Sequence, residues 1–173
     1  MSTKVNVAIP LKVPWCLSPS VSAFRVEVTE NDAAEVAFDV YDLSGRDGVE
    51  DLEFLRVVME FPGGQWVRMY PVIDDDDPDL LGRFDWGGVP SFFDATRSPH
   101  ETGEEFRSAW RAMGVCPDPD VYEIESSTWL GESGAGRFGC RHFLVRGREM
   151  WVEVLALGYS WRWHRPARPP ERG

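Results

Sequence analysis

Apolar and polar residues alternate one by one along several segments of this chain. A period of two is the pattern of a β-strand that buries one face, because successive side chains of a strand point to opposite sides. The pattern is clear in residues 24–29 and again in residues 36–41. Asn31 and Asp32 between these segments favour a turn, so we predict a β-hairpin over residues 24–41.

Residues 53–61 admit two interpretations. Leu52, Leu55 and Met59 would form one stripe of a helix over residues 50–60. As a strand, the same segment would place its odd-numbered apolar residues on one face. The β-branched pair Val57–Val58 and the Pro-Gly-Gly turn that follows favour the strand, and residues 66–73 are the predicted return strand of a hairpin.

One segment has the pattern of an amphipathic helix. Thr102 and Glu105 have the spacing of a capping box, and an apolar stripe of Phe106, Ala109, Trp110 and Met113 follows them. Gly114 stands where a helix commonly ends. The sequence therefore predicts a helix over residues 102–113, preceded by an acidic loop at 74–81 and an irregular segment at 82–99.

The C-terminal third returns to the strand pattern. We predict a short strand over residues 122–126, which Trp129 and Leu130 extend, and a hairpin of residues 141–146 with residues 150–157. Residues 159–163 form a last alternating segment.

These segments predict about seven to eight strands and one helix. Because short turns join consecutive strands, the sheet should be antiparallel. The predicted fold is α+β but mostly β, a curved antiparallel sheet or an open barrel packed with one helix. The length of 173 residues suits a single globular domain over residues 1–164, followed by a disordered Pro-rich tail at 165–173.

Charge is unevenly distributed along the chain, whose net charge is −11. Residues 1–136 hold 10 basic and 26 acidic residues, a net charge of −16, whereas residues 137–173 hold 8 and 3, a net charge of +5. A basic end of this kind can contact nucleic acid or a membrane. The favoured interpretation is that the basic C-terminal strands lie beside acidic ones in the fold.

The cysteines and the N-terminal segment indicate a reducing compartment. Cys16, Cys116 and Cys140 are odd in number, lie far apart and include no CxxC pair. Residues 1–14 lack the unbroken apolar stretch of a secretory signal, and no segment reaches the length of a membrane span. We therefore expect a cytoplasmic protein with no membrane contact.

Two residues are candidates for catalysis. Glu153 shares a strand face with Trp151 and Leu155, so its carboxylate is expected either to pair with an arginine (Arg141, Arg146 and Arg148 are near in sequence) or to have a raised pKa. His142 lies in the preceding strand. It could act as a general base, or it could be a structural histidine whose hydrogen bonds are made within the sheet. Cys140 falls on the same face as His142.

Two further sets of residues are candidates for partner or ligand binding. Asp74, Asp75, Asp76 and Asp77 form an acidic run without the spacing of a calcium-binding EF-hand loop. We therefore expect a solvated loop or a partner contact there rather than a metal site. Trp151, Trp161 and Trp163 stand among arginines, a composition found in protein interfaces and in base-stacking surfaces.

Three functions follow as hypotheses. The first is a non-enzymatic acidic binding protein, an inhibitor or immunity-type partner that neutralises a basic protein. The second is a small β-barrel that binds or converts an apolar small molecule, as a carrier or a cyclase- or isomerase-like enzyme would. A nucleic-acid module ranks last, because acidity repels phosphates. No cofactor motif is present, and the sequence leaves open whether the protein is an enzyme.

Overall fold

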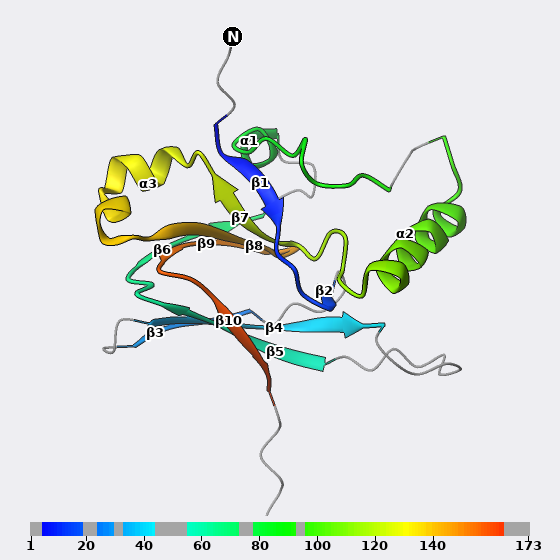
Figure 1. Cartoon of the computed structure of the whole chain (residues 1–173), viewed down its shortest axis with the longest axis horizontal. Coiled ribbons are helices and arrows are strands. Elements are labelled where there is room, and N and C mark those ends of the chain that lie inside the picture. Colours follow the sequence, from blue (N-terminus) through cyan, green and yellow to red (C-terminus); the bar gives the residue numbers. More distant parts are fainter. Residues whose placement is uncertain are drawn as a thin grey trace, which may run out of the picture.

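Two antiparallel sheets pack face to face in the computed structural model, which describes residues 5–18, 24–29, 33–43, 55–72, 78–92 and 96–164 (Figure 1). In order across the sheet, sheet A consists of β1 (Val7–Pro10), β7 (Val121–Glu125), β8 (Arg141–Arg146), β9 (Met150–Ala156) and β6 (Trp66–Pro71). Sheet B consists of β10 (Ser160–Trp163), β5 (Leu55–Pro62), β4 (Ala33–Asp42) and β2 (Trp15–Leu17), with β3 (Arg25–Thr29) also paired with β4.

The predicted fold class is confirmed as mostly antiparallel β-structure with few helices. The strands form two antiparallel sheets, which do not close into a barrel. The described residues form ten strands, more than the seven or eight predicted, because β1 and β2 are too short to display a period-two pattern.

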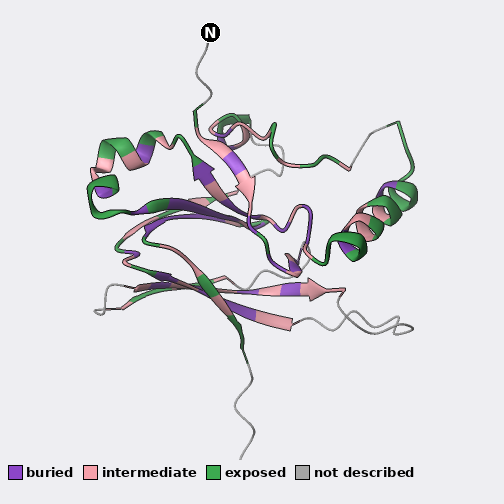
Figure 2. Ribbon diagram, viewed as in Figure 1, coloured by how far each residue is buried: buried purple, intermediate pink, exposed green. Residues whose placement is uncertain are grey.

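The main core lies between the two sheets. Alternate residues of β4, among them Phe38, are buried against the inner face of β8 and β9, as the purple segments of the facing strands show (Figure 2). The strand interpretation of residues 53–61 is confirmed, since Val57, Met59 and Phe61 on β5 point into this core and are 0% exposed. Each fully buried side chain of this kind contributes roughly 1.5–3 kcal/mol to stability.

The predicted hairpin of β5 with residues 66–73 is wrong. β6 pairs with β9 of sheet A, where Trp66 lies opposite Leu155. The turn after β5 is real: Gly63 has a φ of 71°, and a Cβ at Gly64 would come within 2.7 Å of the Phe61 carbonyl oxygen. The chain uses this turn to cross from one sheet to the other, and a crossing turn has the same sequence signal as a hairpin.

The outer face of sheet A is also covered. α1 (Pro78–Leu81) and the loop after it bury Tyr122, Leu144 and Trp151 of the sheet. α3 (Thr128–Ser133) and the 3₁₀ helix η1 (Ala135–Phe138) cover Leu155 (Figure 1). The predicted strand extension through Trp129 and Leu130 is therefore wrong, because the chain turns at Ser126, whose φ is 52°, and begins a helix.

The predicted helix is present as α2 (Pro99–Met113) and ends at Gly114, whose φ is 69°. It begins earlier than predicted. Ser98 caps it and forms the capping box with Glu101, and Pro99 occupies the first helical position. The predicted box partner Thr102 instead lies in the first turn and donates its hydroxyl to the Pro99 carbonyl.

Several predictions concern residues outside the described part of the chain, namely the turn at 30–32, the aspartates Asp74–Asp77 and the tail at 165–173. Among the helices that the structure describes, none has both the length and the apolar character needed to cross a membrane.

Candidate functional site

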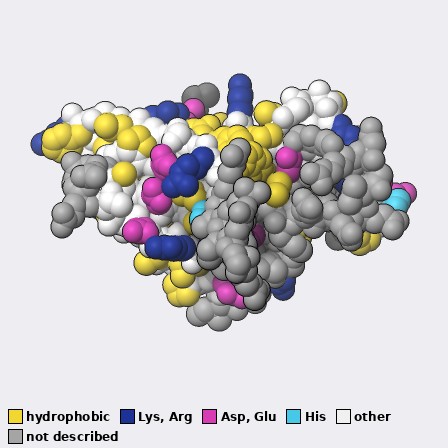
Figure 3. Space-filling view, turned by 90° about the horizontal axis from the view of Figure 1, so that it is seen from below, with side chains coloured by type: hydrophobic (Ala, Val, Ile, Leu, Met, Phe, Trp, Pro, Cys, Tyr) yellow, Lys and Arg dark blue, Asp and Glu magenta, His cyan; other side chains and the backbone are white. Residues whose placement is uncertain are grey.

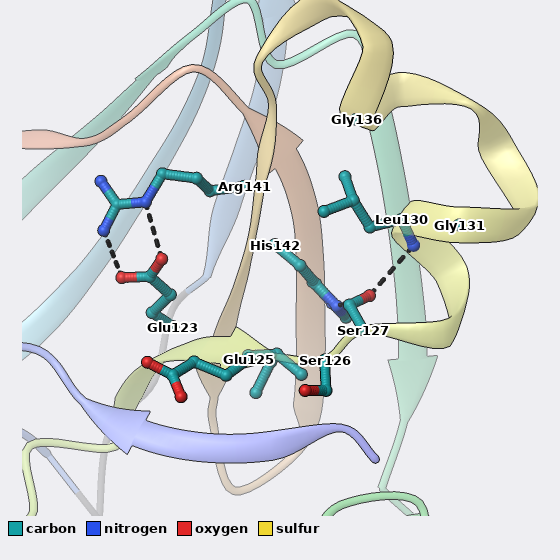
Figure 4. A pocket seen from close by; sticks show the side chains of 10 residues that line it. Glu123, Glu125, Ser126, Ser127, Leu130, Gly131, Gly136, Arg141 and His142 are labelled. Atoms are coloured by element: carbon teal, nitrogen blue, oxygen red, sulfur yellow. Dashed lines mark hydrogen bonds and ion pairs between the residues drawn. The ribbon is translucent and has the colours of Figure 1, made fainter.

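A surface groove of about 630 Å³ lies on the outer side of sheet A, where β7 and β8 separate (Figure 4). The pairing of β7 with β8 ends at Glu123 and Phe143, whereas β7 stays paired with β1 as far as Glu125. α3 follows and forms the opposite wall. The groove is lined by Glu123, Ile124, Glu125, Ser126, Ser127, Leu130, Gly131, Gly136, Arg141 and His142.

Ser127 and His142 meet in this groove. The Ser127 Oγ lies 2.8 Å from His142 Nδ1, and it also accepts the Leu130 N–H at 3.0 Å as the N-cap of α3. Since the backbone donor occupies one lone pair of the oxygen, the hydroxyl hydrogen is free to point at the imidazole. Which of the two groups donates depends on the tautomer of His142.

Glu153 lies behind the histidine. Its Oε2 is 3.3 Å from His142 Nε2, and its Oε1 is 3.1 Å from the Arg83 guanidinium. The contacts are close but bent, so neither His142 Nε2 nor Glu153 Oε1 has an aligned hydrogen bond to a described residue. His142 is 2% exposed and Glu153 1% exposed, so both are shielded from water by the sheet and the segments that cover it.

Aromatic rings enclose this polar group. The His142 and Trp129 rings are nearly perpendicular with centroids 5.2 Å apart, and the centroid of the Phe84 ring lies 6.4 Å from that of His142. Arg83 lies over the Tyr70 ring and donates to its hydroxyl at 2.9 Å. A buried carboxylate is costly unless it is paired, and Arg83 supplies the compensating charge.

The two predicted catalytic candidates, His142 and Glu153, are therefore neighbours. The prediction that an arginine pairs with Glu153 is confirmed, but the arginine is Arg83, from the loop after α1. None of the three arginines near in sequence pairs with Glu153 in the structure; Arg141 pairs with Glu123 and Arg146 with Asp120. Cys140 packs in an apolar cluster with Trp129 and Leu155, and burial raises the pKa of its thiol.

Sequence reasoning missed Ser127. The available signal was the run Ser126-Ser127-Thr128 directly after a strand, since serine and threonine are preferred helix N-caps. Assigning a strand to Trp129 and Leu130 hid this signal.

Three arginines of the C-terminal third, Arg141, Arg146 and Arg162, are paired with carboxylates of the same chain. Arg141 donates to Glu123 at 2.6 Å, and Arg146 lies 2.5 Å from Asp120. Arg162 lies 2.5 Å from Glu60 and 3.4 Å from Glu35 on the outer face of sheet B. Acidic and basic side chains accordingly stand close together on the face seen from below (Figure 3). This agrees with the interpretation that the basic strands lie beside acidic ones.

The carboxyl group of Asp120 has a perturbed pKa. Burial raises its pKa to about 6, against the opposing effect of Arg146. Tyr122 donates its hydroxyl to Asp118 at 2.5 Å, and burial also raises the pKa of this phenol well above its ordinary value. The cluster is a compact ion-pair network on the side of sheet A.

The tryptophans predicted to bind a partner differ in exposure. Trp151 is 4% exposed, beneath Phe84 and Trp86, so it belongs to the core. Trp161 is half-buried and packs edge-on against Trp15 at 5.9 Å. Trp163 is 37% exposed and is the member of this set with the most accessible surface.

In the part of the chain that the structure describes, no group of three or more His, Cys, Asp or Glu side chains could hold a metal ion. The space between the sheets is filled by side chains of the main core. A comparison with protein-family models, with curated proteins and with solved structures finds no match to this chain.

Proposed function

We propose that this protein is an acidic binding protein that docks on a basic surface of a protein partner, in the manner of an inhibitor or immunity-type protein. The observation that carries the proposal is the internal pairing of Arg141, Arg146 and Arg162 with carboxylates of the same chain. The charges of these three arginines are thereby neutralised locally. The chain keeps a net charge of −11, which attracts a basic partner over a long range at low salt.

The groove beside α3 is the proposed docking point. Glu125 on its rim and Glu132 on α3 are both exposed, and no cation of the described residues is paired with either carboxylate in the structure. A lysine or arginine of a partner that enters the groove would find these two carboxylates available. The hydroxyl of Ser126, also exposed on the rim, adds a hydrogen-bonding group.

The other two hypotheses find less support. An enclosed apolar pocket between the sheets would support a ligand-binding barrel, but core side chains fill that space. A nucleic-acid surface needs a cluster of unpaired cations, and three of the arginines in question are bound to carboxylates.

The test begins with affinity capture from a lysate at low salt, followed by titration of the purified captured protein. The double variant Glu125→Gln, Glu132→Gln should lower the association rate constant several-fold and make this rate constant less dependent on salt concentration. The reason is that both carboxylates attract the basic partner as it approaches. Glu104→Gln on α2 is the control, since it removes an exposed carboxylate far along the surface from α3. The proposal is overturned if no protein is captured, or if the double variant binds the captured protein as the wild type does.

A further inference from the structure

Three side chains form a line that leads from the groove into the outer face of sheet A. Ser127 Oγ lies 2.8 Å from His142 Nδ1, and His142 Nε2 lies 3.3 Å from Glu153 Oε2. A hydroxyl, an imidazole and a carboxylate in this order are the groups that activate a serine for nucleophilic attack. They come from three separate elements: the cap of α3, β8 and β9. In the serine proteases the serine contacts Nε2 of the histidine and the carboxylate contacts Nδ1. In this protein Ser127 contacts Nδ1 and Glu153 contacts Nε2.

Only the hydroxyl end of this line is accessible. Ser127 is half-buried and lines the groove, whereas His142 is 2% exposed and Glu153 1% exposed. Figure 4 shows the Ser127 and His142 side chains side by side at one end of the groove. Glu153 is therefore kept from water, and His142 is accessible only where it lines the groove. The low dielectric of the surroundings strengthens the interaction of the imidazole with the carboxylate.

Capping of α3 does not account for this arrangement. As an N-cap, Ser127 needs only the hydrogen bond that its Oγ accepts from the Leu130 N–H at 3.0 Å. Capping does not require a histidine. The histidine, the buried carboxylate and Arg83 behind it add a costly set of polar groups beside the apolar cluster of this face. The backbone contact instead holds the oxygen within hydrogen-bonding distance of His142.

We propose that Ser127 is a catalytic nucleophile and that the groove hydrolyses a small carboxylic ester. Ile124 and Leu130 offer an apolar surface for the acyl group, and Arg141 is the cation among the residues that line the groove. This activity goes beyond the docking of a basic partner and does not depend on it.

The reaction balances with water as the only co-reactant. Ser127 Oγ attacks the carbonyl carbon of the ester while its proton passes to His142 Nδ1, and the Glu153 carboxylate faces the resulting imidazolium. His142 then returns the proton to the alkoxide as the ester C–O bond breaks, which leaves an acyl group on Ser127. Water, deprotonated by His142, releases the carboxylic acid and restores the serine. Ser127 and His142 are thus the catalytic residues, and Glu153 is a positioning residue.

The first experiment separates the nucleophile from the helix cap. Ser127→Asn keeps a side chain that caps helices as well as serine does but removes the nucleophile. We expect p-nitrophenyl acetate hydrolysis to fall at least 100-fold in this variant while its thermal midpoint stays near that of the wild type. A fluorophosphonate should form a covalent adduct on Ser127, located by mass spectrometry of peptides, and should form none on Ser127→Asn.

Two further variants test the rest of the site. Glu153→Gln should lower kcat and shift the pH profile of the hydrolysis, which a purely structural role would not do. Gly131→Phe should raise KM with less effect on kcat, because a Cβ at Gly131 meets nothing within 4 Å and the ring would occupy the groove. His164→Gln, an exposed histidine outside the groove, is the control for hydrolysis by surface imidazoles.

The proposal is overturned if folded Ser127→Asn hydrolyses the ester at the wild-type rate, or if the fluorophosphonate modifies other residues and leaves Ser127 intact. Neither result affects the docking proposal, whose test uses Glu125 and Glu132 and measures association.

Discussion

His142 and Glu153 are diagonal neighbours on paired strands, with His142 opposite Leu155 and Glu153 opposite Leu144 across β8 and β9. This register, together with the shared outer face, brings His142 Nε2 to 3.3 Å from Glu153 Oε2. The pair is thus built into the hairpin itself, and the covering segments supply Ser127 on one side and Arg83 on the other.

Glu153→Gln should destabilise the fold by about 1–3 kcal/mol, because it removes the buried carboxylate that contacts Arg83 and His142. Urea unfolding monitored by tryptophan fluorescence measures this loss. The control is Glu60→Gln, which removes one partner of the exposed Arg162 and should cost less than about 1 kcal/mol. Equal losses in the two variants would contradict the assignment of a buried pair at Glu153.

Two glycine substitutions should have opposite effects. A Cβ at Gly147 would lie 2.7 Å from the Met150 carbonyl oxygen and would also overlap the Phe24 ring, so Gly147→Ala should cost about 1–3 kcal/mol. Gly131 lies in α3 with open space around its Cβ position, so Gly131→Ala should be neutral or stabilise by up to about 1 kcal/mol. The thermal midpoints of the two variants compare these effects, and a loss at both sites would contradict the packing described.

Asp120 should make the protein less stable as the pH rises from about 4 to about 6. Its pKa in the fold is about 6, whereas an unfolded chain has a value of about 3.9. Between these values the folded state binds more protons than the unfolded state, so folding is favoured at the acid end of the window and this contribution is lost at its upper end.

Asp120→Asn removes the titrating group and isolates its contribution. As the pH rises from about 4 to about 6, the unfolding free energy of Asp120→Asn should therefore increase relative to that of the wild type. Urea titrations at several pH values from 4 to 7 measure this difference. A difference that stays constant with pH would show that Asp120 does not titrate there.

Ser98→Ala should destabilise α2 by about 1 kcal/mol, because Ser98 accepts the Glu101 N–H as the N-cap. Glu105→Gln changes the residue that the sequence pattern favoured, and it should alter stability by less than 0.5 kcal/mol, as exposed substitutions usually do. Thermal unfolding of the two variants decides between the two capping assignments.

β4 and β5 could be predicted because one face of each strand is more deeply buried than the other, so a period of two appears in the sequence. β8 and β9 are buried on both faces and could be predicted from their apolar runs and the turn between them. Glu153 stood out as the one carboxylate among apolar neighbours on β9. β1 and β2 are too short to display a period, and their assignment depends on partners far away in the chain.

The rest of the site arises from long-range packing. Arg83, which pairs with Glu153, lies in a loop far from Glu153 in the sequence. The spacing of apolar residues along a strand cannot predict a contact of this kind. The partner of β6 is likewise decided by which sheet has a free edge, so the turn at Gly63 and Gly64 could not distinguish a hairpin from a crossing. Ser127 became recognisable only once α3 was seen to begin there.

The placement of β1 and β2 has a consequence for synthesis. These two N-terminal strands belong to different sheets, and Pro10 pairs with Tyr122, about 110 residues further along. At ribosomal rates of 5–20 residues per second, β1 waits roughly 6–20 s before its partner strand has been made. During that interval its backbone hydrogen-bonding groups and the apolar side chains that follow it remain uncovered. The nascent chain therefore passes through a period in which protection from aggregation depends on the ribosome surface or on a chaperone.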